Sequence, residues 1–154
     1  MINLKDRGIK GKIITSTYLG FNHPNVFKEL LMFDNIEVHI FDNEEIGFHP
    51  KGYIFKHKNN FDIIVGSSNL TQSALSTNQE WNIKIQASIC DDIVKEMIDE
   101  FNMQWLHSVP LTKSWISEYE KIYVPNPVIP VIKHKNIHPN LMQQEALTSL
   151  TALR

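Results

Sequence analysis

The sequence has one cysteine, no long apolar run and almost no net charge, and each of these absences excludes a class of protein. Cys90 alone cannot form an internal disulfide or supply the thiolates of a zinc site, which agrees with a reducing compartment. The longest apolar runs are a few residues, as at 63–65, so the sequence predicts neither a membrane-crossing segment nor a signal peptide. We therefore expect a cytoplasmic protein with no membrane partner, and a buried Cys90.

The composition that remains is that of one globular domain with unevenly placed charges. The 154 residues are 42% hydrophobic and 21% charged, which is enough to bury a core. The net charge of −2 gives no overall attraction for a polyanion, so any such contact has to be local. Basic side chains are concentrated in residues 1–12 and 49–58. These runs are typical of solvated faces, but a dipolar surface follows if they meet in space.

Hydrophobic periodicity predicts an α/β fold. Alternating or β-rich segments predict strands over 12–17, 36–41, 53–56, 61–65 and 82–88. Helical spacing of apolar residues predicts helices over 24–33, 91–107 and 112–123. The polar segment 56–60 between two strands predicts a hairpin turn.

Five polar side chains along this pattern have the chemistry needed at a phosphodiester. His49 and Lys51 stand two apart at the start of a strand, so their side chains share one face. After the hairpin returns, Ser67 and Asn69 offer donors near the same strand end. His49 can act as nucleophile or proton donor, while the other three can hold the nonbridging oxygens. Glu80, before the next strand, can hydrogen-bond His49 and fix its tautomer.

The segments His49-Pro50-Lys51 and Gly66-Ser67-Ser68-Asn69 resemble the signature of the phospholipase D superfamily. That signature is a His-x-Lys pair followed by an Asn in a Gly-Ser-x-Asn turn, and Glu80 stands where the family keeps a glutamate. The resemblance covers about residues 9–123 and implies a phospholipase-D-like mixed β-sheet flanked by helices on both faces. One departure is that Lys56 stands where many members have an aspartate.

The resemblance also implies roles for these residues. His49 forms a phosphohistidine, Glu80 orients it, and Lys51, Ser67 and Asn69 hold the phosphate, without a metal ion or other cofactor. The pattern is most similar to the metal-independent nucleases found among restriction endonucleases and in domains fused to helicases, which implies DNA as the partner. Two histidines flank one phosphate in this family and this chain has one motif. The resemblance therefore implies a homodimer with a twofold axis close to His49.

The domain organisation expected from the sequence has three parts. A phospholipase-D-like nuclease domain spans 1–124, and either its N-terminus is clipped or the preceding sheet position of the family is filled otherwise, for example by the partner chain. A proline-rich linker spans 125–136, and 137–154 is the helical start of a following helicase domain. Segment 137–147 is similar to the glutamine-containing segment of DEAD-type helicases. An amphipathic helix that packs on its own domain explains this segment equally well.

Two functions from different classes follow. The first is a metal-independent phosphodiesterase or nuclease that acts on DNA as a domain of a helicase-type protein. The second is a non-catalytic DNA-binding or dimerisation module that positions a helicase motor. Hydrolysis of lipid is a third reading, disfavoured because the sequence has no amphipathic stretch with a basic face.

Overall fold

The computed structural model describes residues 5–17, 22–42, 47–71, 74, 77–125, 144–145 and 148. Its elements follow in the order β1 (Gly11–Ser16), α2 (Pro24–Leu30), β2 (Ile36–Phe41), β3 (Gly52–Lys56), β4 (Asn60–Gly66), β5 (Asn82–Ser88), α4 (Asp92–Leu106), β6 (Val109–Pro110) and α5 (Lys113–Ile122). Each strand and helix predicted within 12–123 is present, with ends that differ by a few residues. The predicted linker and C-terminal helix lie almost wholly outside the described residues.

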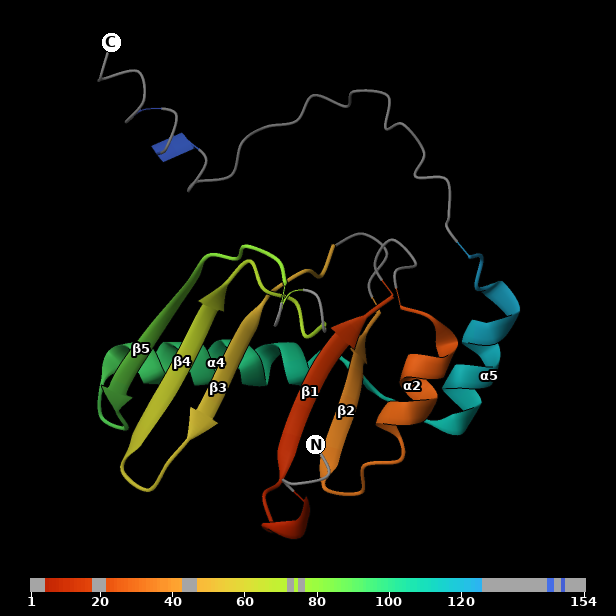
Figure 1. Ribbon diagram of the computed structural model, residues 1–154, viewed down its shortest axis with the longest axis horizontal. Coiled ribbons are helices and arrows are strands. Elements are labelled where there is room, and N and C mark those ends of the chain that lie inside the picture. The colour runs from red at the N-terminus through yellow and green to blue at the C-terminus, as the bar shows by residue number, and fades with distance from the viewer. Residues whose placement is uncertain are drawn as a thin grey trace.

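The strands form two hydrogen-bonded groups of three. β1 and β2 are parallel and β6 adds antiparallel to β2, whereas β3, β4 and β5 form an antiparallel meander. In Figure 1 the strands run across the molecule as β5, β4, β3, β1 and β2, and no ladder joins β3 to β1. The α/β class and the mixed strand directions are confirmed, while the single expected sheet is divided between β1 and β3.

One helix, α4, connects the two groups of strands. Its residue Val94 is buried against Phe61 and Ile63 of β4, in a core that also contains Ala87. At its other end Trp105 stacks on the His39 ring of β2, with ring centroids 3.6 Å apart. Figure 1 shows α4 behind both sheets. The hydrophobic stripe of α4 therefore holds the second sheet and β2 at fixed positions on one helix.

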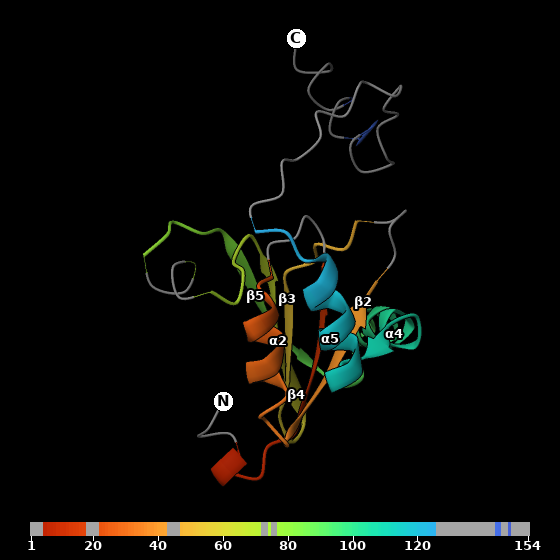
Figure 2. The same cartoon turned by 90° about the vertical axis from the view of Figure 1, so that its right-hand side faces the viewer.

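The opposite face of β2 carries the second core. Val38 and Ile40 alternate with His39, so they point away from α4 and pack against Phe27 of α2 and Ile116 of α5. Figure 2 shows α2 and α4 on opposite sides of these strands. Helices thus flank both faces of the first sheet, as expected. Among the described helices, α4 alone covers the second sheet.

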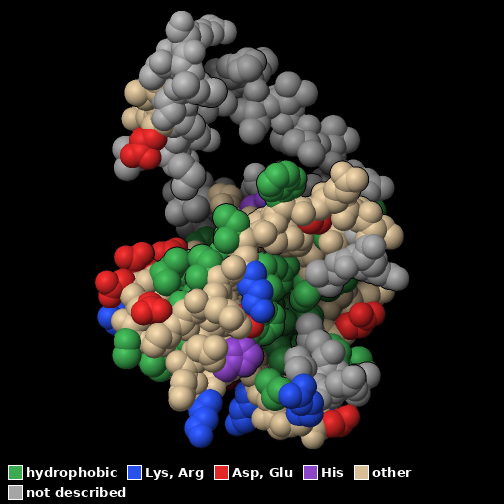
Figure 3. Space-filling model, turned by 60° about the vertical axis from the view of Figure 1, so that its left-hand side comes forward, with side chains coloured by type: hydrophobic (Ala, Val, Ile, Leu, Met, Phe, Trp, Pro, Cys, Tyr) green, Lys and Arg blue, Asp and Glu red, His purple; other side chains and the backbone are tan. Residues whose placement is uncertain are grey.

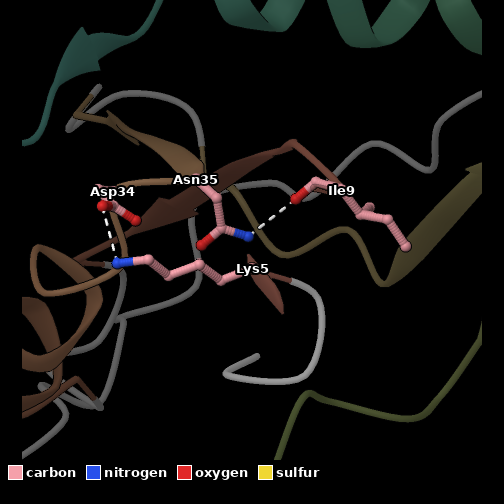
Figure 4. A network of polar contacts seen from close by, with 4 residues as sticks. All are labelled: Lys5, Ile9, Asp34 and Asn35. Atoms are coloured by element: carbon pink, nitrogen blue, oxygen red, sulfur yellow. Dashed lines mark hydrogen bonds and ion pairs between the residues drawn. The ribbon is translucent and has the colours of Figure 1, made fainter. Parts of the chain in front are cut away.

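The segment before β1 is held to the loop before β2 by two polar contacts (Figure 4). Lys5 Nζ lies 2.8 Å from Asp34 Oδ2, and Asn35 Nδ2 donates to the Ile9 carbonyl at 2.9 Å. The hydrogen bond from Lys5 lowers the pKa of Asp34 below its usual value. The start of β1 therefore has a fixed position.

The expectation that Cys90 is buried is wrong. Cys90 is exposed rather than buried, because it lies in the turn between β5 and α4. Trp81 is 89% exposed, so it is no part of a core within the described chain, whereas Trp115 packs against Phe27. Within the described residues, no helix has the length and apolarity needed to span a bilayer.

Replacing Ile63 by alanine tests the core beneath β4. Ile63 is fully buried, so Ile63→Ala is expected to lower the free energy of unfolding by about 2–5 kcal/mol. Val65→Ala, on the same face of the same strand but 45% exposed, is the control and is expected to cost much less. Urea denaturation measures both values, and equal losses would contradict this account of the core.

Candidate active site

The pairing of β3 with β4 brings the two motif segments to one end of the second sheet. Gly52 pairs with Val65, and the Gly66 amide donates to the Lys51 carbonyl at 3.3 Å. Residues 49–51 enter β3 where residues 66–69 leave β4, at the upper end of these strands in Figure 1. The juxtaposition predicted from the sequence is therefore present.

His49 and Lys51 are in direct contact. The Lys51 ammonium lies 3.0 Å from Nδ1 and 3.1 Å from Nε2 of the His49 ring. An ammonium has only donors and a neutral imidazole has one acceptor nitrogen, so at most one of these two contacts is a hydrogen bond from Lys51. A neutral imidazole with a lone pair is the form of histidine that can act as a nucleophile. The side chain of His49 is exposed, so this nitrogen can be reached from solvent.

Ser67 is joined to Glu80 and to the backbone that precedes β5. Its hydroxyl donates to Glu80 Oε2 and accepts from the Trp81 amide at 3.0 Å, and its own amide donates to the Trp81 carbonyl at 2.9 Å. The second oxygen of Glu80 accepts from Asn78 Nδ2 at 3.4 Å. The structure thus brings Glu80 to the Gly66–Asn69 turn, and an orienting contact from Glu80 to His49 stays a prediction.

Gly66 is required by the close approach of β5. A Cβ atom at this position would lie 2.2 Å from the Trp81 carbonyl oxygen and 2.3 Å from Asn82 Oδ1. A tight turn is a common reason for a glycine, but Gly66 does not have a positive φ and ends a regular strand. Glycine is therefore needed at this position because β5 lies too close beside it for a Cβ atom.

Three residues that hold the turn were missed by the sequence analysis. Ser68 is buried; its carbonyl accepts from the Tyr53 hydroxyl at 2.8 Å and its Oγ accepts from Asn82 Nδ2 at 2.7 Å. Burial raises the pKa of Tyr53, which keeps its hydroxyl protonated as a donor. With Ser68 anchored, the neighbouring residues Ser67 and Asn69 are both exposed at the surface. The sequence has no local signal for this arrangement, because its contacts join residues that are 15 and 14 positions apart.

Replacing Gly66 by alanine tests the crowding at the turn. Gly66→Ala is expected to lower the free energy of unfolding by about 1–3 kcal/mol, because backbone atoms of β5 must move. Gly52→Ala is the matched control, since a Cβ at Gly52 meets nothing within 4 Å. Thermal or urea denaturation compares the two variants. A Gly66→Ala protein as stable as Gly52→Ala would refute the close approach.

A comparison with protein-family models places this geometry in a known family. Residues 1–105 match the model described as the PLD-like domain of cardiolipin synthase, and this range contains His49, Lys51, the 66–69 turn and Glu80. A search of curated proteins returned no match. The matched range is more than half of the chain and includes the whole second sheet. The chain therefore belongs to the PLD-like domain family of the phospholipase D superfamily, a superfamily of phosphodiesterases.

Proposed function

We propose that this domain is a metal-independent phosphodiesterase that cleaves DNA, with His49 as the nucleophile. The observation that carries the proposal is the Lys51 ammonium held against the His49 ring, beside the 66–69 turn. A phosphate oxygen can accept the N–H donors of this ammonium, and when it takes the donor that now contacts His49, the ring lone pair is released to attack phosphorus. A nucleophile and an anion-binding group are therefore adjacent in the free protein.

The proposed reaction proceeds in two displacements at phosphorus. A nitrogen of His49 forms a bond to phosphorus, the bond to the leaving oxygen breaks, and His49 of the partner subunit gives that oxygen a proton. Water then attacks the phosphohistidine, returns a proton to the second histidine and releases His49. Lys51 and Asn69 donate to the nonbridging oxygens throughout both steps.

The contact between Ser67 and Glu80 limits what Ser67 can do in the first step. A hydroxyl has one proton, and in the free protein Glu80 accepts it. Ser67 can donate to phosphate only after its hydroxyl rotates away from Glu80. We therefore assign the larger share of phosphate binding to Lys51 and Asn69, and to Ser67 mainly the positioning of Glu80.

Exposed apolar side chains beside the site support a dimer that completes it. Val65, Leu70, Trp81 and Ile83 are 45%, 59%, 89% and 69% exposed. They flank the 66–69 turn, and Val65 pairs directly with Ile83. An apolar surface of this kind is typical of a protein interface. Val65 and Ile83 lie on the face of the sheet opposite to Lys51, so the part of this surface next to His49 is formed by Leu70 and Trp81 at the strand end, and we place the twofold axis there.

The substrate class and protein context form part of the same proposal. DNA is preferred because Lys51, Lys56, Lys58 and Lys84 lie on or beside the strands of the second sheet, and no described helix offers an apolar docking face beside the site. The matched family is described by cardiolipin synthase, so a phospholipid is the alternative substrate to be tested. Attachment to a helicase motor is supported by the glutamine-containing segment at 137–147 alone.

Plasmid nicking in excess EDTA tests catalysis by His49. The wild type is expected to nick supercoiled DNA, and His49→Ala is expected to lose about 10³-fold or more because both nucleophile and proton donor are removed. His107→Ala, an exposed histidine at the end of α4, is the control and should cleave normally. Binding of DNA without cleavage by the wild type would support the non-catalytic module instead. Hydrolysis of a phospholipid but not of DNA would reassign the substrate.

Sedimentation equilibrium tests the shared site. The wild type is expected at twice the chain mass of 17.9 kDa, and Trp81→Glu is expected to give monomers that no longer cleave. Ile122→Glu changes a similarly exposed apolar residue on α5 and should stay dimeric and active. A wild-type monomer that cleaves DNA would rule out a site built from two chains.

A further inference from the structure

The basic segment before β1 and the 56–58 end of the second basic segment both lie at the end of the molecule opposite His49. β1 begins at Gly11, directly after Lys10, and β3 ends at Lys56, directly before the 57–59 turn. Figure 1 shows the start of β1 and the end of β3 at the same lower end of the molecule. In Figure 3, Lys and Arg side chains gather with a histidine along this lower rim.

The charges at this end are only partly neutralised. Lys5 is held by Asp34 and Lys84 by Asp62, at 2.8 and 2.9 Å. Four further cations are exposed and form no ion pair within the described residues: Arg7, Lys10, Lys56 and Lys58. We call these four residues the basic end. They leave a local excess of positive charge on a chain whose net charge is −2.

The hairpin turn presents its two lysines on a fixed backbone. The His57 amide donates to the Asn60 carbonyl at 2.8 Å, which closes the turn. The His57 ring lies 3.4 Å from Asp62 Oδ2, an oxygen that Lys84 also contacts. The hydrogen bond from Lys84 lowers the pKa of Asp62, so this carboxylate stays ionised and retains His57. Lys56 and Lys58 therefore flank an anchored residue.

We propose that the basic end is a second surface for the DNA backbone, remote from the cleaved bond. The proposal rests on the proposed function, because it takes DNA as the substrate bound at His49. Seven residues of extended chain separate His49 from Lys56, a span of about 23 Å. The odd spacing puts Lys56 on the α4 face of β3, opposite to Lys51, so the duplex meets the basic end at the tip of the hairpin, about seven base pairs of 3.4 Å from the scissile phosphate.

The chemistry of the turn favours nucleic acid over a membrane. Residues 56–60 are Lys, His, Lys, Asn and Asn, with no apolar side chain to enter a bilayer. Lysine contacts to phosphate fix position without reading sequence. The basic end therefore adds affinity and register on DNA, while the chemistry remains at His49.

The test measures binding of a 30-base-pair duplex as a function of salt. The double variant Lys56→Gln/Lys58→Gln is expected to bind about tenfold more weakly, with the slope of log affinity against log salt smaller by about one per lysine removed. Arg7→Gln/Lys10→Gln, from the other segment, is expected to act alike. Lys113→Gln/Lys121→Gln on α5 makes the same change in net charge and should leave affinity unchanged.

Two further measurements separate this proposal from the catalytic one. With saturating duplex, both double variants of the basic end should cleave at the wild-type rate. A hairpin of about eight base pairs is too short to reach the basic end from the scissile phosphate, so both variants should bind it as tightly as the wild type does. If the wild type cleaves DNA and both double variants keep its affinity and its salt slope, the proposal that the basic end binds DNA is wrong. Weaker binding by the variants, with no cleavage by the wild type, would support the basic end and overturn catalysis. Loss of binding to phosphatidylserine vesicles but not to DNA would reassign the surface to lipid.

Discussion

The register between β3 and β4 is the constraint on which the site depends. Because Gly52 pairs with Val65, residues 49–51 and 66–69 leave the sheet at the same end. A register slip of one residue would turn every side chain of β4 to the other face and expose Ile63. The buried core under α4 therefore fixes the position of the motif residues, although none of them belongs to that core.

The second sheet also explains why the polar 66–69 turn is tightly packed while the apolar side chains beside it are exposed. β5 approaches Gly66 so closely that only a glycine fits. This approach allows Ser67 to hydrogen-bond both the amide and the carbonyl of Trp81. That contact leaves the Trp81 side chain in solvent. Binding groups and an exposed apolar surface are thus products of one strand pairing, which is the physical reason to connect catalysis with dimerisation.

Local pattern was sufficient for most of the fold and for part of the site. Strict alternation located β2 and β5, and the spacing of His49 and Lys51 correctly placed their side chains together. The division between β3 and β1 could not be predicted, because the pairing of strands distant in sequence leaves no local signal. The Ser67–Glu80 contact was missed for a similar reason, since it depends on the path of the backbone before β5. Cys90 was misplaced because composition favours burial, whereas a turn exposes it.

Titration with inorganic phosphate, followed by amide and side-chain resonances, tests the central claim most directly. If the strand register builds one anion site, then the resonances of His49, Lys51, Ser67 and Asn69 shift together along a single binding curve. Shifts confined to one of the two segments, or separate curves for 49–51 and 66–69, would contradict the account.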